Sequence, residues 1–226
     1  MKKIIIIVSA FIGLYMLCGI AAAEPTVEGP SGLLVNPTAD IATPQSAWVG
    51  GNYIQWSEGD FDSTIWTYTL TGGISENFEM GAMGMNQTDG DNGFGLNAKY
   101  LVLKEDPSKP GIAVGIDYTD VGSALTRFYV VASKYYSADD TKNQKAMSFH
   151  AGLGYWNGQD IDNEWTFWGG ADFNFTDKII GIVEYLDAKE SFDGFTYGVR
   201  FYGNESWTAQ AGMIDGNFML GSNFIF

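Results

Sequence analysis

Hydrophobic and polar residues alternate along most of the chain after Ser46. In the stretch GIAVGIDYT, residues 111–119, large apolar residues occupy every second position and small or polar residues lie between them. A period of two places successive side chains on opposite faces of a strand. The stretches TIWTYTLTGGI, FGLNAKYLV and FTYGVRFY repeat this pattern, and no comparable helical period follows Ala23. The pattern therefore predicts an all-β protein.

Twelve such segments can be counted, at residues 46–57, 64–75, 78–87, 93–104, 111–119, 126–137, 145–156, 165–176, 179–187, 194–203, 206–214 and 217–226. Most are long enough for a tilted strand to cross a bilayer. We therefore predict an antiparallel up-and-down transmembrane β-barrel of about 12 strands over residues 46–226. A soluble barrel or sandwich, with its apolar face turned inward, produces the same alternation.

Two features favour the membrane barrel. The apolar face carries aromatic residues near the strand ends, as interfacial girdles require. These residues are Trp66, Phe94, Tyr100, Tyr118, Trp165, Phe175, Tyr185, Phe195 and Trp207. The other face is rich in Gly, Thr, Ser and Asn with isolated charges, which suits a crowded polar lumen.

The chain ends in GSNFIF, and four apolar residues of the last segment share one face: Phe218, Leu220, Phe224 and Phe226. A terminal aromatic residue suits the lipid interface, and it resembles the C-terminal signature that the outer-membrane barrel assembly machinery reads. An even strand number places both termini on one side. We therefore expect a bacterial outer-membrane protein with periplasmic N- and C-termini.

The first 23 residues have the layout of a secretory signal peptide. Two lysines precede an apolar run from Ile4 to Ile20, and cleavage is expected after Ala23, with Ala21 and Ala23 as the small-residue site. A retained N-terminal anchor and a lipoprotein modified at Cys18 are the alternatives. Cys18 is the only cysteine, so the exported part has neither disulfide nor thiolate nucleophile.

Residues 24–45 are expected to form a periplasmic lead-in or plug segment, because Pro37 and Pro44 interrupt strand pairing. Removal of the signal peptide leaves ten basic residues against 27 acidic ones, a net charge of −17. Nucleic acid and anionic lipid surfaces are therefore poor partners.

Acidic residues gather in the connections that follow odd-numbered strands, which are extracellular in the expected orientation. They are Glu58, Asp60, Asp62, Asp89, Asp91, Asp120, Asp160, Asp162, Glu164, Asp187, Glu190, Asp193 and Asp215, against one base, Lys189. Such a rim is either a solvated loop face, or it holds divalent cations beside lipopolysaccharide or enriches cations at a pore mouth.

Ionisable residues on the inward face must be paired or hydrated. The alternation places these lumen residues inside: Lys99, Asp117, His150, Asp172, Glu184, Arg200 and Gln210. Lys99 and Asp117 lie on adjacent segments, as do Glu184 and Arg200, so each pair is expected to cross-link the lumen wall. The interior either conducts or is plugged by these side chains and residues 24–45.

A hydrolase is the alternative from another functional class. Ser148 and His150 share a face with Asn157 nearby, and the outer-membrane phospholipase is a twelve-stranded barrel with a Ser/His/Asn set. The alternation turns Ser148 and His150 away from lipid, however, so no catalytic residue is predicted. TDGDNG and GQDIDNE lack the full spacing of a calcium loop, and neither a metal site nor a cofactor is predicted.

Several motifs resemble the YjbH-type outer-membrane family associated with exopolysaccharide production. They are GPSGLLVNPTADIA at residues 29–42, the hairpin GISENFEMGAMG, and the closing stretches FNFTDKIIGIVEYLD, FTYGVRFY and AGMIDGNFMLGSNFIF. The resemblance implies that Glu184 and Arg200 occupy the positions of a recurrent Glu and Arg. The chain is shorter than full-length members and lacks a convincing lipobox cysteine, so it resembles a short single-barrel member.

These observations predict a non-enzymatic outer-membrane barrel. Its role is either that of a small porin-like channel, with a preference for cations, or that of a barrel component of a polysaccharide-export or envelope system. The expected partners are outer-membrane lipids and lipopolysaccharide, the barrel assembly machinery, and polysaccharide or small cationic solutes, but no nucleic acid.

Overall fold

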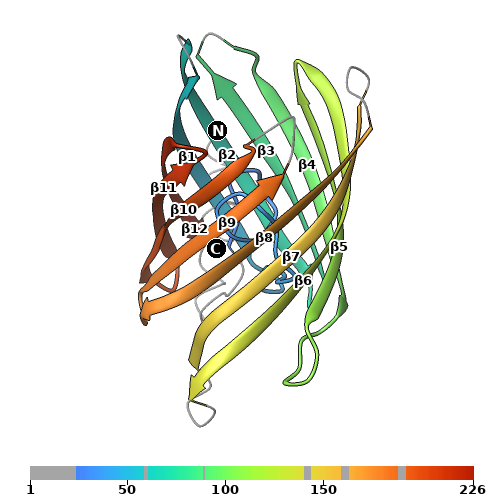
Figure 1. Cartoon of the computed structure of the whole chain (residues 1–226), viewed down its shortest axis with the longest axis vertical. Helices are drawn as coiled ribbons and strands as arrows, with labels where there is room; N and C mark the ends of the chain where they lie inside the picture. The colour runs from blue at the N-terminus through green and yellow to red at the C-terminus, as the bar shows by residue number, and fades with distance from the viewer. Residues whose placement is uncertain (1–23, 59–60, 89, 140–143, 159–162, 188–191) are drawn as a thin grey trace, which may run out of the picture.

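The alternating segments form a single closed antiparallel barrel in the computed structural model, which describes residues 24–58, 61–88, 90–139, 144–158, 163–187 and 192–226 (Figure 1). The strands are β1 (Ala47–Glu58), β2 (Phe61–Ser75), β3 (Phe78–Gln87), β4 (Gly93–Leu103), β5 (Gly111–Val121), β6 (Ser123–Asp139), β7 (Gln144–Gly158), β8 (Glu164–Thr176), β9 (Ile179–Asp187), β10 (Gly194–Asn204), β11 (Trp207–Ile214) and β12 (Asn217–Ile225). Each strand pairs with its sequence neighbours, and β12 closes on β1. The prediction of a twelve-stranded up-and-down barrel is confirmed.

Closure leaves no unpaired strand edge, which is the condition for a sheet to cross a bilayer. At the seam, Ala47 and Phe226 exchange backbone hydrogen bonds of 3.0 and 2.9 Å. We call the end of the barrel that holds these two residues the terminal end, and the opposite end the loop end. No helix in the described part of the chain is long and apolar enough to span a membrane. Ala21, Ala23 and Cys18 of the expected signal peptide lie outside the described residues.

β6 and β7 are longer than the predicted segments 126–137 and 145–156. Pairing of β5 with β6 ends at Ser133, and pairing of β7 with β8 begins at Met147, so the ends of β6 and β7 pair only with each other. This hairpin projects at the terminal end (Figure 1). At the loop end Gly122 alone links β5 to β6, with a φ of +75° that favours glycine.

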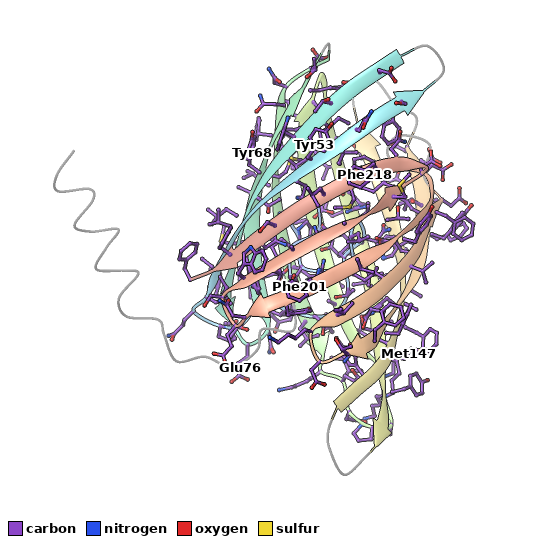
Figure 2. The ribbon with its side chains drawn as sticks, turned by 90° about the vertical axis from the view of Figure 1, so that its left-hand side faces the viewer. Tyr53, Tyr68, Glu76, Met147, Phe201 and Phe218 are labelled. Atoms are coloured by element: carbon purple, nitrogen blue, oxygen red, sulfur yellow. The ribbon has the colours of Figure 1, made fainter. Side chains whose placement is uncertain are left out.

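The outer face of the barrel is apolar. Trp165 and Phe195 are 65% and 63% exposed, and Leu70 and Leu96 on other strands are 51% and 53% exposed. Figure 2 shows labelled residues of this kind, such as Tyr68, on the outside of the ribbon. A monomer in water rarely exposes a continuous apolar belt of this kind, whereas a bilayer solvates it. The orientation of the apolar face therefore argues against the soluble sandwich.

Residues 24–45, which we call the inner segment, run through the interior of the barrel (blue in Figure 1). All residues from Glu24 to Ala39 are buried except Glu28, which is half-buried. Two isolated bridges, Pro25 with Ser31 and Gly32 with Pro37, fold the segment back on itself.

The lumen is less polar than the alternation predicts. One buried apolar cluster joins the inner segment to the wall: Val27, Leu33, Leu34, Val35 and Ala39 pack with Ile54, Ile65, Ala113, Tyr129, Val131, Trp168, Ile182, Leu186, Phe192, Ile214 and Met219. These wall residues face inward because they cover the apolar side chains of the inner segment. The wall and the segment therefore share one hydrophobic core inside the barrel.

Candidate functional site

Glu184 in β9 is enclosed by backbone N–H groups of the inner segment. Its Oε1 atom accepts hydrogen bonds from the N–H of Leu34 at 3.0 Å and of Val35 at 2.9 Å. Its Oε2 atom accepts from the N–H and the side-chain amide of Asn36, at 2.9 and 2.8 Å. Successive N–H groups that converge on one anion form a nest. Because Glu184 is only 1% exposed, this contact anchors the middle of the inner segment without help from water.

Arg200 in β10 holds the adjacent residues of the same segment. Its guanidinium donates to the carbonyl oxygens of Gly32 at 3.3 Å and Leu33 at 2.8 Å, and Nε lies 3.1 Å from a carboxylate oxygen of Glu24. The side-chain oxygen of Gln210 in β11 accepts from the same guanidinium at 2.9 and 3.1 Å. Arg200 therefore joins β11 of the wall to both the beginning and the middle of the inner segment.

Lys99 in β4 and Glu79 in β3 form a buried ion pair at 3.1 Å, with both side chains 0% exposed. Lys99 also donates to the carbonyl and hydroxyl oxygens of Ser31, at 2.7 and 2.6 Å. Glu79 accepts from the Ser31 N–H at 2.9 Å and from the Ala42 N–H at 2.7 Å. All charges and polar groups of this cluster have partners, which a buried ion pair requires.

Arg127 in β6 pairs with Asp117 in β5, with 2.8 Å between Nε and Oδ2. A carboxylate of the inner segment, Glu28, lies 3.4 Å from the same guanidinium. The guanidinium also lies over the rings of Trp156 at 4.9 Å and Trp168 at 5.6 Å. Cation–π contacts of this kind stabilise a desolvated arginine.

The wall pairs differ from those expected. Lys99 pairs with Glu79, and Asp117 pairs with Arg127, so the expected pair of Lys99 with Asp117 is replaced by two pairs. Glu184 and Arg200 lie on adjacent strands, but both bind the inner segment. Strand register explains the first difference, because it places Lys99 opposite Glu79 and Asp117 opposite Arg127. Glu184 and Arg200 are offset in register, with Glu184 opposite Thr196 and Arg200 opposite Ile180, and residues 24–45 supply nearer partners for both.

His150 in β7 is the centre of a side-chain network. Its Nδ1 lies 2.8 Å from the hydroxyl oxygen of Ser133 in β6, and its Nε2 lies 2.9 Å from a carboxylate oxygen of Asp172 in β8. Ser148 donates to the other Asp172 oxygen at 3.2 Å. The N–H of Ala39 in the inner segment donates to Ser133 at 2.8 Å. The histidine therefore contacts Ser133 and Asp172, whereas Ser148 binds Asp172 and not the histidine.

All seven predicted lumen residues lie on the inward face. Six of them are buried, and Asp172 is half-buried: Lys99, Asp117, His150, Glu184, Arg200, Gln210 and Asp172. The predicted C-terminal residues lie on the outer face, where their exposed fractions are 44%, 51%, 48% and 46% for Phe218, Leu220, Phe224 and Phe226.

Four further residues that hold the inner segment escaped the sequence analysis: Glu79, Arg127, Ser133 and Trp168, whose Nε1 donates to the carbonyl of Pro37 at 3.2 Å. Glu79 and Arg127 belong to segments whose alternation is weak. Their neighbours in the sequence indicate that both charges face inward, because Glu79 follows Phe78 and Arg127 precedes Phe128, and these aromatic residues belong on the outer face. No three or more His, Cys, Asp or Glu side chains among the described residues are grouped to hold a metal ion.

Charge at the loop end is acidic. Of the acidic residues predicted there, Asp60, Asp89, Asp160, Asp162 and Glu190 lie outside the described residues, as does Lys189.

At the terminal end, the exposed Asp106 accepts hydrogen bonds from the hydroxyl and N–H of Ser108, both at 2.7 Å. These bonds hold the pKa of Asp106 below its ordinary value, so this carboxylate is charged at neutral pH.

A scan against protein-family models finds no match, and a search of the curated proteins finds none either. Among solved structures, the fold is similar to that of the KdgM porin in complex with disordered oligogalacturonate, with a TM-score of 0.61 and 13% identity over 79% of this chain and 99% of that chain. For the KdgM porin alone the TM-score is 0.60, with 14% identity over 80% and 99%.

The fold is also similar to that of the NanC porin, with a TM-score of 0.55 and 12% identity over 79% of this chain and 98% of that chain. At these identities the likeness shows a shared outer-membrane porin-type barrel fold. None of these comparisons supports membership of the YjbH-type family.

Proposed function

We propose that the protein is a porin-type channel of the bacterial outer membrane whose lumen is closed at rest by the inner segment. The observation that carries the proposal is the burial of residues 24–39 inside a barrel of porin-type fold. A segment that is 0% exposed at Val27 and Leu34 leaves no room for water around those side chains. Conduction therefore requires the inner segment to move.

The charge pairs of the wall are suited to such movement. When the inner segment leaves, Arg127 keeps Asp117 and Lys99 keeps Glu79. Arg200 keeps Gln210 in the same way. Most wall charges therefore keep a partner when the inner segment leaves. Water that enters the lumen hydrates the rest, so no charge is left both buried and unpaired. Glu184 is the exception, because its acceptor atoms are filled by the inner segment.

We assign an oligosaccharide or another small polar solute to this channel. The KdgM porin of the comparison is described in complex with oligogalacturonate, and this lumen combines charged pairs with amide and hydroxyl groups, as a hydrated polar solute requires. In the proposed orientation both termini are periplasmic and the acidic loop end faces outward, where it attracts cations. A role in exopolysaccharide export, which the YjbH resemblance implies, rests on the sequence motifs alone.

The experiment that tests the proposal locks the inner segment in place. A Cβ atom at Gly111 lies 3.6 Å from the Cβ of Ala39, within the range of a disulfide. The double variant Ala39→Cys, Gly111→Cys adds the only thiols to residues 24–226, since Cys18 is the sole native cysteine. Single-channel currents of the refolded variant are recorded in a planar bilayer before and after reduction.

We expect the oxidised double variant to be silent and the reduced form to conduct in steps like the wild type. Each single variant serves as a control and should conduct under both conditions. Equal currents from the oxidised and reduced forms would show that solute passes without movement of the inner segment. Silence from correctly folded wild-type protein would contradict the channel itself.

A hydrolase remains the rival function because Ser133, His150 and Asp172 form a chain of hydrogen-bond contacts. Ser133 is 2% exposed and accepts the N–H of Ala39, so its hydroxyl is covered. A serine nucleophile must be accessible, so that the carbonyl carbon of a substrate can approach its hydroxyl oxygen. We therefore propose a structural role for this chain, and an esterase activity that disappears in Ser133→Ala would reverse that assignment.

A further inference from the structure

A cavity of about 540 Å³ opens at the terminal end of the barrel, between the β8–β9 and β10–β11 turns. Trp48 and Thr208 form its buried part, and Lys178, Asn204 and Ser206 belong to its exposed rim. Its volume lies within the ordinary range for small-molecule sites. None of the contacts that anchor the middle of the inner segment involves these five residues, so the cavity adjoins the base of that segment, where Trp48 packs against Ala42, and not its middle.

Trp48 contains a polar group without a partner. The side chain is only 2% exposed, and its indole Nε1 has no hydrogen-bond partner among the described residues. A buried donor without a partner destabilises the fold, because it has lost its hydrogen bonds to water and gained none in the protein. Such a group in a native protein calls for an explanation, and a ligand oxygen bound in the adjoining cavity supplies one.

The cavity combines aromatic surface with polar groups of both kinds. Trp48 and Tyr202 supply aromatic rings, and Lys178, Asn204 and Ser206 supply donors and acceptors at the rim. The lining carries two acids, Asp177 and Glu205, against the one lysine, so it does not favour a polyanion. A sugar ring matches this environment, because its C–H face packs on the half-buried ring of Tyr202 while its hydroxyls donate and accept hydrogen bonds.

We propose that this cavity is a binding subsite for a neutral oligosaccharide at the periplasmic mouth of the barrel. The subsite rests on the proposed function, since it names the class of solute that the channel passes. It also touches the closing device: Trp48 packs against Ala42 of the inner segment and against Ile225 of β12. A sugar in this cavity therefore lies beside the ring that packs on the base of the inner segment.

The test is calorimetric titration of the full refolded mature protein in detergent, with maltotriose as the neutral probe and trigalacturonate as the charged probe. Trp48→Phe keeps an apolar ring and removes the Nε1–H, and Lys178→Ala changes only the exposed rim. We expect both variants to weaken maltotriose binding, about tenfold for Trp48→Phe. Trp165→Phe, at a 65% exposed position of the outer face, is the matched control and should bind as the wild type does.

Absence of maltotriose binding to the wild type, or equal affinity in the wild type and both site variants, would overturn the subsite. Tighter binding of trigalacturonate would overturn the preference for a neutral sugar. Bilayer recordings separate this result from the proposed function. Maltotriose binding by a silent barrel keeps the subsite and removes the channel, whereas conduction without binding removes only the subsite.

Discussion

At the scale of single residues, the interior of this barrel is organised by side chains that bind backbone. Glu184 receives three backbone N–H groups, and Arg200 donates to two backbone carbonyls of the same stretch. Backbone groups are present at every residue, so the inner segment needs no charge of its own at these positions. One acid and one arginine on adjacent strands therefore fix the path of residues 32–36.

Glu184→Ala should release the inner segment while the twelve strands of the barrel wall stay paired. Removal of the carboxylate leaves the N–H groups of Leu34, Val35 and Asn36 buried without an acceptor, and each such group costs about 1–3 kcal/mol. Amide exchange in residues 24–45, followed by mass spectrometry, should rise about 100-fold or more, since 1.4 kcal/mol corresponds to a factor of ten.

Glu76→Ala provides the control for that measurement, because Glu76 is exposed on the β2–β3 turn (Figure 2). The same substitution there should leave the exchange rates of residues 24–45 unchanged. If Glu184→Ala also left them unchanged, the nest would contribute nothing to holding the inner segment.

At the scale of elements, the alternation predicts the wall better than it predicts what the wall contains. The segment 179–187 alternates clearly, and β9 occupies the same residues. In β6, by contrast, Tyr129 and Val131 face inward against the inner segment while Phe128 and Val130 face outward. Both faces are then apolar, so the period of two is weak in the sequence, although the strand is regular in the structure.

The alternation also did not predict which residues pair with the charged side chains of the lumen. Register places Lys99 directly opposite Glu79 and Asp117 directly opposite Arg127, and alternation alone does not give that register. That Lys99 also donates to Ser31 depends on where residues 24–45 lie in the lumen. Two prolines predicted that this stretch is not a strand, but no local pattern predicts its path across the barrel.

Gly170 in β8 provides a test of how closely the inner segment and the wall pack. A Cβ atom there would come within 2.4 Å of Leu33 Cδ1, and within 3.0 Å of Glu184 Cβ. Gly170→Ala should therefore lower the free energy of unfolding by about 1–3 kcal/mol, as overpacking does. Urea titration of the refolded protein, followed by tryptophan fluorescence, measures the change.

Gly84→Ala is the matched substitution in β3, because a Cβ atom at Gly84 meets nothing within 4 Å. We expect this variant to stay within about 0.5 kcal/mol of the wild type, as surface substitutions do. Equal stability of the two variants would mean that the inner segment yields readily to a methyl group at Gly170.

At the scale of the whole molecule, the protein reverses the usual arrangement of a globular domain. The outer face of its wall is an apolar belt, and many of its polar and charged side chains are inside, together with a core that the inner segment completes. The connections between strands are short at both ends, the longest being residues 104–110. Occlusion of the lumen therefore falls to the inner segment and not to long loops folded over a mouth.

Phe226→Ser should separate assembly in the cell from stability in detergent. The side chain is 46% exposed, and the seam contacts of Phe226 with Ala47 use backbone atoms only. The refolded variant should therefore keep the heat-modifiable gel migration of a closed barrel, while its amount in the outer membrane falls several-fold. Phe175→Ser, at a 61% exposed position of β8, is the control and should be inserted normally; equal insertion of both variants would argue against a C-terminal signal at Phe226.

The position of the inner segment also sets the order in which the molecule can be made. Glu184 lies 148 to 150 residues after the N–H groups that it binds, so residues 34–36 are synthesised long before their partner. Contacts of such large sequence separation form slowly. Until β8 to β12 have been made, the inner segment lacks Trp168, Ile182, Ile214 and Met219 of its core, and the seam between β1 and β12 cannot form. A chain of this protein bound for the outer membrane is therefore expected to depend on chaperones until its last strands have been made.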